Sequence, residues 1–318
     1  PPSARRSHLL LSNLLTVTGQ VGTLFLMMGV GFALAKLGKL TEQARGQLSY
    51  LLLYIVCPCV MVDCFQVERT PDLVREVALG AALATVCYVV YLLIALFFFR
   101  RESPDVRDCL RFGTVYGNIG FMGIPLVQSI LGADAVIYGA LSLAAFNLTL
   151  WTLGVLVMGG KQAFSVKKAA VNPGVLGLAV SLLLFLGNVR LPAVLGSAVS
   201  FLSDLNTPLA MVVIGGQLAC ADLAATFRQA RLYLACFLKL ILVPVLTLLA
   251  LLPLRLSPGL YCALVLLSAT PVAGTTSLFA QQFGRDPTPA VQFITLSTLL
   301  SILTLPLFAV AAKMISGF

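Results

Sequence analysis

The stretch GNIGFMGIPL at residues 117–126 lies inside a strongly apolar segment, yet it holds three glycines, an asparagine and a proline. Glycine and proline in a helix interior cost about 1 and about 3 kcal/mol relative to alanine. This composition predicts that a helix is interrupted here. Pro125, which has no backbone N–H, would help to enforce the break. Asn118 would place a neutral hydrogen-bonding group at that break.

The whole chain is too apolar for a water-soluble protein. Of its 318 residues, 59% are hydrophobic and only 10% are charged, whereas soluble domains carry about 25% charged residues. We therefore expect an all-α integral membrane protein. The net charge of +9 arises from short basic clusters between apolar runs. That is the pattern of cytoplasmic loops and not of a nucleic-acid-binding surface.

Ten apolar segments are long enough for transmembrane helices, which need about 20 residues. Ten spans place both termini on one side of the membrane. Thirteen of the 21 Lys and Arg residues then fall in loops on the opposite side and seven on the side of the termini. Because basic loops stay in the cytoplasm, we expect both termini to be extracytoplasmic. The spans cover about residues 14–35, 47–65, 76–99, 110–131, 135–158, 172–188, 194–219, 231–252, 259–282 and 289–312.

The polar stretch at residues 159–172 divides these spans into two sets of five. Residues 1–158 and 173–318 would each form a five-helix repeat, with a cytoplasmic linker between them. Because five is odd, the second set enters the membrane from the opposite side, which is the plan of inverted-repeat transporters. Pro58 and Pro208 lie in the second span of each half, in agreement with this plan.

The ninth span contains SATPVAGTTS at residues 268–277, a counterpart to the first broken stretch. Interrupted spans in corresponding positions of two halves point to a transporter binding site. Irregular backbone survives in a bilayer only where protein buries it or where it lines a wet cavity. The two breaks are therefore expected to face each other, and their half-helix N-termini would favour an anion. No metal site or disulfide is expected, because the eight cysteines fall mostly in apolar runs.

The predicted substrate-binding residues are hydrogen-bonding groups at the breaks and the glycines and prolines that shape them. Glycine also serves close helix packing in membranes, so packing is an alternative reading of each single glycine. The predicted set is Asn118, Gly120, Gly123, Pro125, Thr270, Pro271, Thr275 and Thr276.

Lys239 is the one basic residue that lies deep inside a predicted span and not at its end. Charged residues in spans are rare and are functional candidates, although a lysine can also extend its stem to the interface. Lys239 would bind an anionic substrate or pair with a carboxylate, and Asp204 in the seventh span is the expected partner. We expect one or both to tune coupling or gating. The coupling ion stays open between H⁺ and Na⁺, and no cofactor is expected.

Four segments, residues 29–61, 117–132, 207–219 and 268–307, resemble the auxin efflux carrier family of plant and bacterial membrane transporters. The resemblance implies a fold similar to the bile acid sodium symporters, in which broken helices 4 and 9 cross. It implies a scaffold domain of helices 1, 2, 6 and 7 and a transport domain of helices 3–5 and 8–10. Family members work by elevator-like alternating access, commonly as homodimers.

The resemblance also implies a substrate class and some of its contacts. Plant members export indole-3-acetate, and bacterial relatives are associated with malate, malonate and similar acids. By match to the motif, Asn118 and the backbone beside Pro125 contact substrate, and Pro271 marks the second crossover. The short loop at residues 159–172 resembles compact bacterial members of the inner (plasma) membrane.

We therefore expect a secondary active transporter for a small organic anion, a mono- or dicarboxylate or an auxin-like acid. One alternative is a sodium-coupled symporter of the bile acid type. Another is a non-transporting membrane receptor or scaffold. An enzyme is not expected, because the chain has no HExxH motif and its single histidine, His8, lies near the N-terminus.

Overall fold

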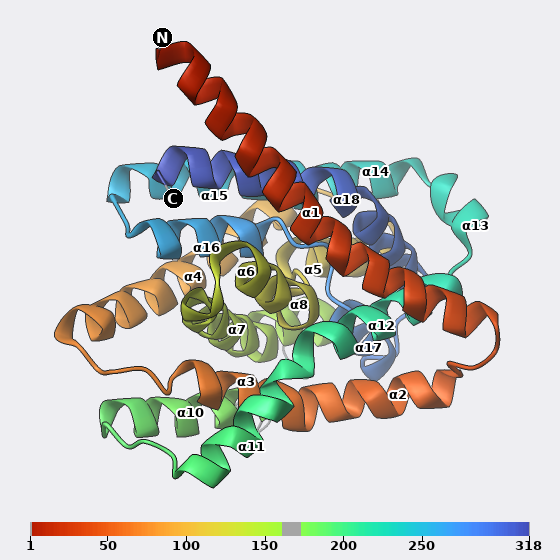
Figure 1. Cartoon of the computed structure of the whole chain (residues 1–318). Helices are drawn as coiled ribbons and strands as arrows, with labels where there is room; N and C mark the ends of the chain where they lie inside the picture. Colours follow the sequence, from red (N-terminus) through yellow and green to blue (C-terminus); the bar gives the residue numbers. More distant parts are fainter. Residues whose placement is uncertain (1, 161–172, 318) are drawn as a thin grey trace.

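The computed structural model describes the backbone of residues 2–160 and 173–317 and the side chains of residues 18–160 and 175–317. These residues form helices and no named strand, as expected for an all-α chain (Figure 1). The predicted linker at 159–172 falls almost wholly outside them. Seven helical segments are long and apolar enough to cross a membrane, and Ile119–Leu131, Val175–Leu186 and Pro258–Ser268 are shorter apolar helices. The seven are Thr18–Lys36, Glu42–Cys64, Pro71–Phe97, Ala133–Gly159, Ala193–Ala219, Ala230–Leu254 and Thr288–Ser316.

Several of these segments are built from successive α-, π- and 3₁₀-helical pieces. In chain order the pieces are α1 (Pro2–Lys36), α2 (Glu42–Leu51), η1 (Leu52–Val56), α3 (Cys57–Cys64), α4 (Pro71–Phe97), α5 (Pro104–Val115), η2 (Ile119–Gly123), α6 (Ile124–Leu131), η3 (Ala133–Ala135), α7 (Val136–Thr149), η4 (Leu150–Gly154), α8 (Val155–Gly159), α10 (Pro173–Leu186), α11 (Ala193–Asp204), α12 (Asn206–Ala219), α13 (Leu223–Phe227), α14 (Ala230–Phe237), η6 (Leu238–Leu242), α15 (Val243–Leu251), η7 (Leu252–Leu254), α16 (Pro258–Ser268), α17 (Thr275–Gln282) and α18 (Thr288–Ser316).

Three helices widen into a π-helical turn just before a proline. The turns η1, η2 and η6 precede Pro58, Pro125 and Pro244. A proline ring clashes with the preceding turn and leaves one carbonyl without its usual donor, and a local π turn is one way to accommodate it. Each of these helices therefore continues through its proline.

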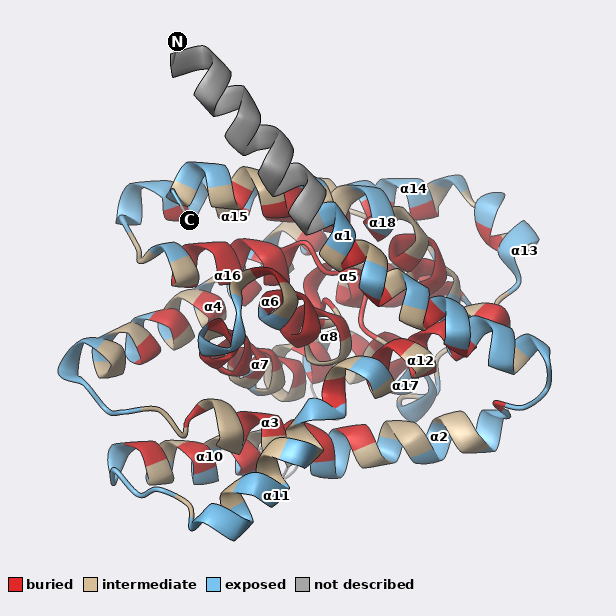
Figure 2. Cartoon of the chain, in the orientation of Figure 1, coloured by how far each residue is buried: buried red, intermediate tan, exposed pale blue. Residues whose placement is uncertain are grey.

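The buried residues gather around α5, α6, α7 and α16. Figure 2 shows them in the middle of the molecule, with more exposed residues on α2, α10, α11 and α15. All residues of α16 from Leu260 to Ser268 are buried. On the lower side of Figure 1, α3 packs against α10 and α11, while α1 lies along α12. The elements that carry both predicted breaks thus lie at the centre.

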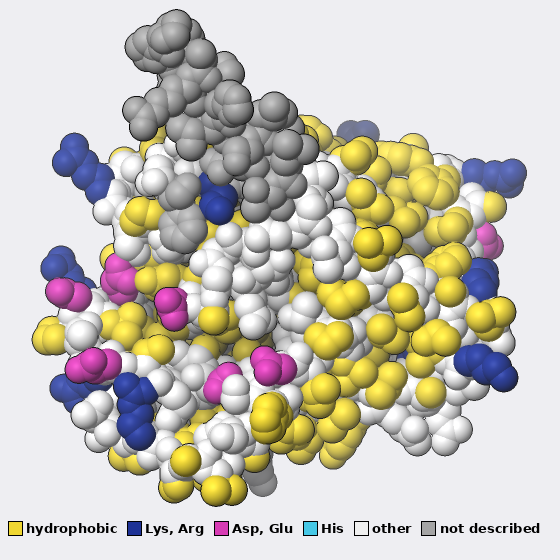
Figure 3. All heavy atoms as spheres, viewed as in Figure 1, with side chains coloured by type: hydrophobic (Ala, Val, Ile, Leu, Met, Phe, Trp, Pro, Cys, Tyr) yellow, Lys and Arg dark blue, Asp and Glu magenta, His cyan; other side chains and the backbone are white. Residues whose placement is uncertain are grey.

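The outer surface is rich in large apolar side chains. Leu26, Leu183, Phe201 and Leu303 are between 69% and 75% exposed. In Figure 3 hydrophobic side chains spread across the face, and Lys and Arg stand mainly at its left and right edges. Water would disfavour so much exposed apolar surface, whereas lipid tails would cover it. Together with the apolar helices, this surface identifies a multi-pass membrane protein.

Two glycines allow α1 and α12 to touch backbone to backbone. A Cβ on Gly31 would overlap the carbonyl oxygen of Val212, and a Cβ on Gly215 would overlap that of Met28. Small residues commonly permit such close helix approach in membranes. The two helices are therefore joined where no side chain larger than hydrogen fits.

We expect Gly31→Leu to separate α1 from α12 and to lower the thermal midpoint of the purified protein in detergent by several degrees. Overpacking costs about 1–3 kcal/mol, and the obstacle here is backbone that cannot rotate away. Gly29→Leu is the matched control on the same helix, because a Cβ there has no neighbour within 4 Å. Equal midpoints for the two variants would contradict the close crossing.

Candidate functional site

The two breaks lie side by side and are joined by backbone hydrogen bonds. Residues 116–118 and 269–274 lie outside the helices. The N–H of Asn118 donates to the carbonyl oxygen of Pro271 (2.7 Å), and the N–H of Ala273 donates to that of Tyr116 (3.0 Å). Gly117 and Val272 form the resulting antiparallel bridge. The expectation that the breaks face each other is confirmed, and the crossing satisfies backbone groups that the helices leave unpaired.

Asn118 forms the corner from which the second half-helix starts. Its φ of −77° and ψ of 64° are those of an inverse γ-turn, closed by the N–H of Ile119 on the carbonyl oxygen of Gly117 (2.8 Å). The side-chain oxygen accepts from the N–H of Phe121 (3.4 Å) and so caps η2. Within the described residues the amide nitrogen Nδ2 donates no hydrogen bond. Because the residue is only half-buried, Nδ2 can donate to a ligand.

The second break is held by hydroxyl groups around Pro271. Thr270 Oγ1 donates to the carbonyl oxygen of Leu267 (2.7 Å), and the N–H of Val272 donates to Ser297 Oγ on α18 (3.1 Å). Thr270 and Ser297 are fully buried. These two buried hydroxyl groups therefore fix the backbone of the crossing.

The glycines of the first break divide into two kinds. A Cβ on Gly117 would overlap Thr270 Oγ1 and lie 2.8 Å from Lys239 Nζ. A Cβ on Gly123 would lie 2.6 Å from Leu267 Cδ2. Gly120 differs, since the nearest atom to its Cβ would be Leu143 Cδ1 at 3.7 Å. Gly117 and Gly123 therefore let the half-helices approach, while Gly120 leaves room at the half-exposed side of the crossing.

Thr275 and Thr276 begin the other half-helix, α17. Their Oγ1 atoms are buried and have no hydrogen-bond partner within the described residues. A buried polar atom left unpaired costs about 1–3 kcal/mol, so these hydroxyls are groups that a ligand or water would satisfy. The N-terminus of a helix also carries partial positive charge, although the N–H groups of Thr276 and Ser277 already donate to the carbonyl oxygens of Ala273 (3.0 Å) and Gly274 (3.2 Å). The two threonine hydroxyls and Asn118 Nδ2 make a set of neutral donors suited to an anion.

Lys239 lies against the opposite side of the crossing. Its side chain is among the largest that are fully buried, and Nζ donates to the carbonyl oxygen of Ser268, the last residue of α16 (3.2 Å). A helix C-terminus carries partial negative charge, which the ammonium offsets. Within the described residues Lys239 forms no ion pair.

The expected pairing of Lys239 with Asp204 is not formed. Asp204 is exposed at the end of α11. That helix packs against α3, whereas η6, which carries Lys239, packs against α5 and α18. Similar positions along two spans do not bring side chains together when the spans lie in different parts of the bundle.

A cavity of about 20 Å³ lies beside Lys239, lined also by Tyr88, Tyr91, Ser142 and Ser268. A single water needs about 10–15 Å³, so the cavity is of water size and is too small for a dicarboxylate. This cavity beside Lys239 therefore does not accommodate an organic substrate. Asn118, Gly120 and Thr275, in contrast, are only half-buried, so their side of the crossing is partly open.

Pro125 lies away from the crossing itself. It is buried in the first turn of α6, and the helix runs through it from Ile119 to Leu131. The expectation that Pro125 enforces the break is wrong in this respect, because the chain leaves helical geometry upstream, at residues 116–118. Pro271, in contrast, lies in the crossing and accepts its shortest hydrogen bond.

A group of polar residues on the neighbouring helix was not predicted from the sequence. α12, which starts at Asn206, packs against η2. Asn206 is 2% exposed, and its Nδ2 has no partner within the described residues. Thr207 Oγ1 donates to Gln128 Oε1 on α6 (3.5 Å). The sequence pattern could have indicated these residues, because the polar Asn206 and Thr207 immediately precede Pro208 in a predicted span.

Comparisons with known proteins agree with these features. A family model described as "Membrane transport protein" matches residues 16–167 and 162–309. A relative from Rhizobium meliloti (strain 1021), named "Putative malonate transporter", is 29% identical over 306 residues, which are 91% of this chain and 93% of the relative. An "Uncharacterized transporter" from Methanothermobacter thermautotrophicus is 23% identical over 300 residues, covering 92% and 97%.

The family match covers nearly the whole chain, including both broken helices and the helices that pack around them. The apolar helices and exposed apolar surface fit the same assignment. The chain belongs to the membrane transport protein family, as its resemblance to the auxin efflux carriers indicated, and is a transporter and not an enzyme.

Proposed function

We propose that the protein is a secondary active transporter that binds a small organic anion at the crossing of its two broken helices. The observation that carries the proposal is the asymmetry of this crossing. Three neutral donors that have no partner in the described part of the chain lie at the two half-helix N-termini: Thr275 Oγ1, Thr276 Oγ1 and Asn118 Nδ2. The lone ammonium of Lys239 is buried beside the same crossing.

A carboxylate fits this arrangement because it accepts several hydrogen bonds at once. Asn118 and the two threonines supply donors without a full charge, and the half-helix ends add partial positive charge. The buried ammonium makes the potential at the crossing more positive without touching the substrate. Binding is then favourable, yet no direct ion pair has to be broken for release.

We infer that the substrate is a dicarboxylate such as malonate or malate, and that an auxin-like monocarboxylate is the next candidate. The relative from Rhizobium meliloti carries malonate in its name. A second carboxylate would need donors across from the crossing. Asn206 Nδ2, which has no partner within the described residues, and Thr207 on α12 are suitably polar.

The proposed architecture is ten spans in two inverted repeats, residues 1–158 and 173–318. The seven long and three shorter apolar helices support it. So does the correspondence of the halves, since Pro58 and Pro208 lie in their second spans and the breaks after α5 and α16 lie in their fourth. In this scheme α1, α2–α3, α10 and α11–α12 form the scaffold domain, and the remaining helices form the transport domain.

Transport would then follow an elevator-type movement of the transport domain against the scaffold. The glycine-mediated contact between α1 and α12 supports a rigid scaffold. We further propose a homodimer in the inner membrane with both termini extracytoplasmic, on the basis of the charge distribution and the family resemblance.

We infer that the ammonium of Lys239 occupies the position at which a coupling cation would otherwise bind. It offsets the partial negative charge at the C-terminal end of α16. The ammonium donates to the Ser268 carbonyl and lies next to Gly117 and Thr270. An additional cation at this position would be repelled. The sodium-coupled alternative therefore has less support than coupling to protons or transport without a coupling ion.

The test is uptake of labelled malonate, malate, succinate and indole-3-acetate into proteoliposomes. We expect saturable uptake of at least one dicarboxylate that is unchanged when sodium is replaced by choline. The same vesicles with and without an inward proton gradient would show whether protons drive it. Absence of uptake across the whole panel would contradict the carrier, and strict sodium dependence would contradict the role of Lys239.

A further inference from the structure

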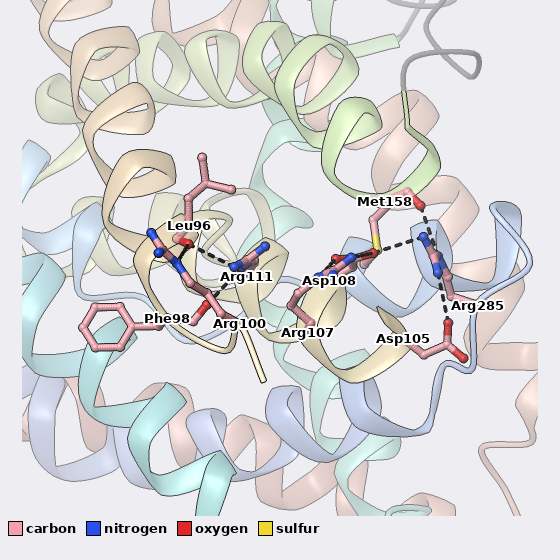
Figure 4. A network of polar contacts seen from close by, with 9 residues as sticks. All are labelled: Leu96, Phe98, Arg100, Asp105, Arg107, Asp108, Arg111, Met158 and Arg285. Carbon is pink, nitrogen blue, oxygen red and sulfur yellow. Dashed lines mark hydrogen bonds and ion pairs between the residues drawn. The ribbon is translucent and has the colours of Figure 1, made fainter. Parts of the chain in front are cut away.

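A groove lies between α4, α5 and the η4–α8 segment, away from the crossing. Its volume is about 310 Å³, and its walls are aliphatic: Leu92, Leu96, Leu153, Leu156 and Val157. Arg107, Asp108 and Arg111 of α5 line its polar part. Figure 4 shows these residues within a network of four arginines and two aspartates.

Part of this network is internally neutralised. Arg107 contacts Asp108 through Nε (2.8 Å) and Nη2 (3.3 Å). Arg285 contacts Asp108 (3.1 Å) and Asp105 (3.3 Å), and it also donates to the carbonyl oxygen of Met158. Two guanidinium groups and two carboxylates are thus bound to one another, and these contacts tie α5 to the loop before α18.

Two further arginines have no carboxylate partner within the described residues. Arg111 donates to the carbonyl oxygens of Phe98 (3.1 Å) and Leu96 (2.9 Å). Arg100 donates to Leu96 (3.4 Å) and lies over the ring of Phe97 at 5.3 Å. Arg111 is repelled electrostatically by Arg107 and Arg100 and is attracted by Asp108, which it does not contact but which binds Arg107 and Arg285. Figure 4 shows Arg100 and Arg111 together near the end of α4. Glu102 in the same loop pairs with Arg231 (3.1 Å).

Arg100 and Arg111, which contact no carboxylate in the described part of the chain, lie near the end of a candidate membrane span. α4 is an apolar candidate span that ends at Phe97, so Arg100 follows directly after the hydrophobic segment. Leu93, Leu96 and Phe97 on the same end of the helix are exposed. Cationic groups beside an apolar groove at the end of a span are placed at the depth of lipid head groups.

We propose that this groove binds an anionic phospholipid, with its phosphate on Arg111 and Arg100 and an acyl chain along the aliphatic walls. Arginine is suited to phosphate because its planar guanidinium donates two parallel hydrogen bonds. The Leu and Val walls match an acyl chain and would make no favourable contact with a free inorganic anion. The lipid would brace the end of α4 against α5 and α8.

The test is native mass spectrometry of the purified full-length protein with dioleoylphosphatidylglycerol, dioleoylphosphatidylcholine or inorganic phosphate added in detergent. We expect one phosphatidylglycerol to be retained in preference to phosphatidylcholine, and phosphate not to displace it. Arg100→Gln/Arg111→Gln should weaken this retention about 30-fold, given the usual contribution of each basic residue near an anionic lipid surface. Lys36→Gln/Arg228→Gln removes the same charge from exposed positions elsewhere and should retain the lipid.

Two further variants separate the groove from general charge and from misfolding. Leu156→Trp fills the aliphatic wall without changing charge and should also reduce retention. Arg100→Gln alone alters an exposed side chain and should reduce retention by a smaller factor if the double variant fails to fold. Equal retention by the groove variants and the charge-matched control would overturn the proposal, as would displacement of the lipid by phosphate.

Discussion

Replacing Asn118 by alanine is expected to lower uptake of the transported dicarboxylate by about 10- to 100-fold, because a hydrogen bond to a charged group contributes about 1.5–3 kcal/mol. Nδ2 of Asn118 makes no hydrogen bond within the described residues, so its loss leaves no buried protein acceptor unpaired. The side-chain oxygen caps η2, and loss of a helix cap costs only about 1 kcal/mol of stability. Initial uptake rates over a range of substrate concentrations, measured beside the thermal midpoint, would check both statements.

Asn118→Asp is the control that separates binding from folding. Aspartate has nearly the same shape, retains an oxygen that accepts from the N–H of Phe121, and is favourable at a helix N-terminus. It removes the donor and places a negative charge where the substrate carboxylate would bind. We expect normal stability with uptake as low as in the alanine variant or lower. Unchanged affinity and rate in both variants would mean that the stretch serves packing alone.

Replacing Lys239 by methionine is expected to abolish most transport while leaving stability unchanged or slightly higher. Removing a buried charge that has no ion-pair partner within the described residues relieves its desolvation cost, which offsets the loss of its hydrogen bond to the Ser268 carbonyl oxygen. Methionine also fills irregular spaces well. The loss would be functional, since the ammonium offsets the C-terminal end of α16 through Ser268 and makes the crossing attractive to an anion. Uptake rate and thermal midpoint in the same preparation are the measurements.

Two companion variants define what Lys239 contributes. Lys239→Arg retains the charge but needs more room than the cavity of about 20 Å³ provides, so we expect partial uptake with reduced stability. Asp204→Asn should transport normally, because Asp204 is exposed on a helix packed against α3. Full uptake by Lys239→Met would remove the lysine from the mechanism. If the Asp204 variant showed the same loss of uptake as the Lys239 variants, that result would support the predicted pairing of the two residues.

The two helix breaks and Pro125 show how much of the site could be predicted from the sequence. The two breaks were predicted because glycine and proline are costly inside a helix wherever the helix lies, and they occur as expected near Asn118 and Pro271. Pro125 misled the prediction about the position of the first break. A proline needs only a local change in the turn before it, and η2 provides that change. Sequence alone does not distinguish a proline that ends a helix from one that follows a π turn.

The partners of the polar residues could not be read from the sequence. Lys239 was identified as exceptional because charge is rare in an apolar span, but its neighbour is a carbonyl oxygen at the end of α16, not Asp204. Gly117 and Gly123 look equivalent to Gly120 in the sequence, yet only the first two have no space for a Cβ. Asn206 became part of the candidate site only through the packing of α12 against η2.

The sequence by itself determined that this chain is a helical membrane transporter with two interrupted spans, because those properties follow from local composition and from the cost of unpaired backbone in lipid. The tertiary structure alone decided which groups meet at the crossing and which side of it is open. Those contacts join residues more than a hundred positions apart, such as Asn118 and Pro271. Helix packing creates such contacts, and no local pattern encodes them.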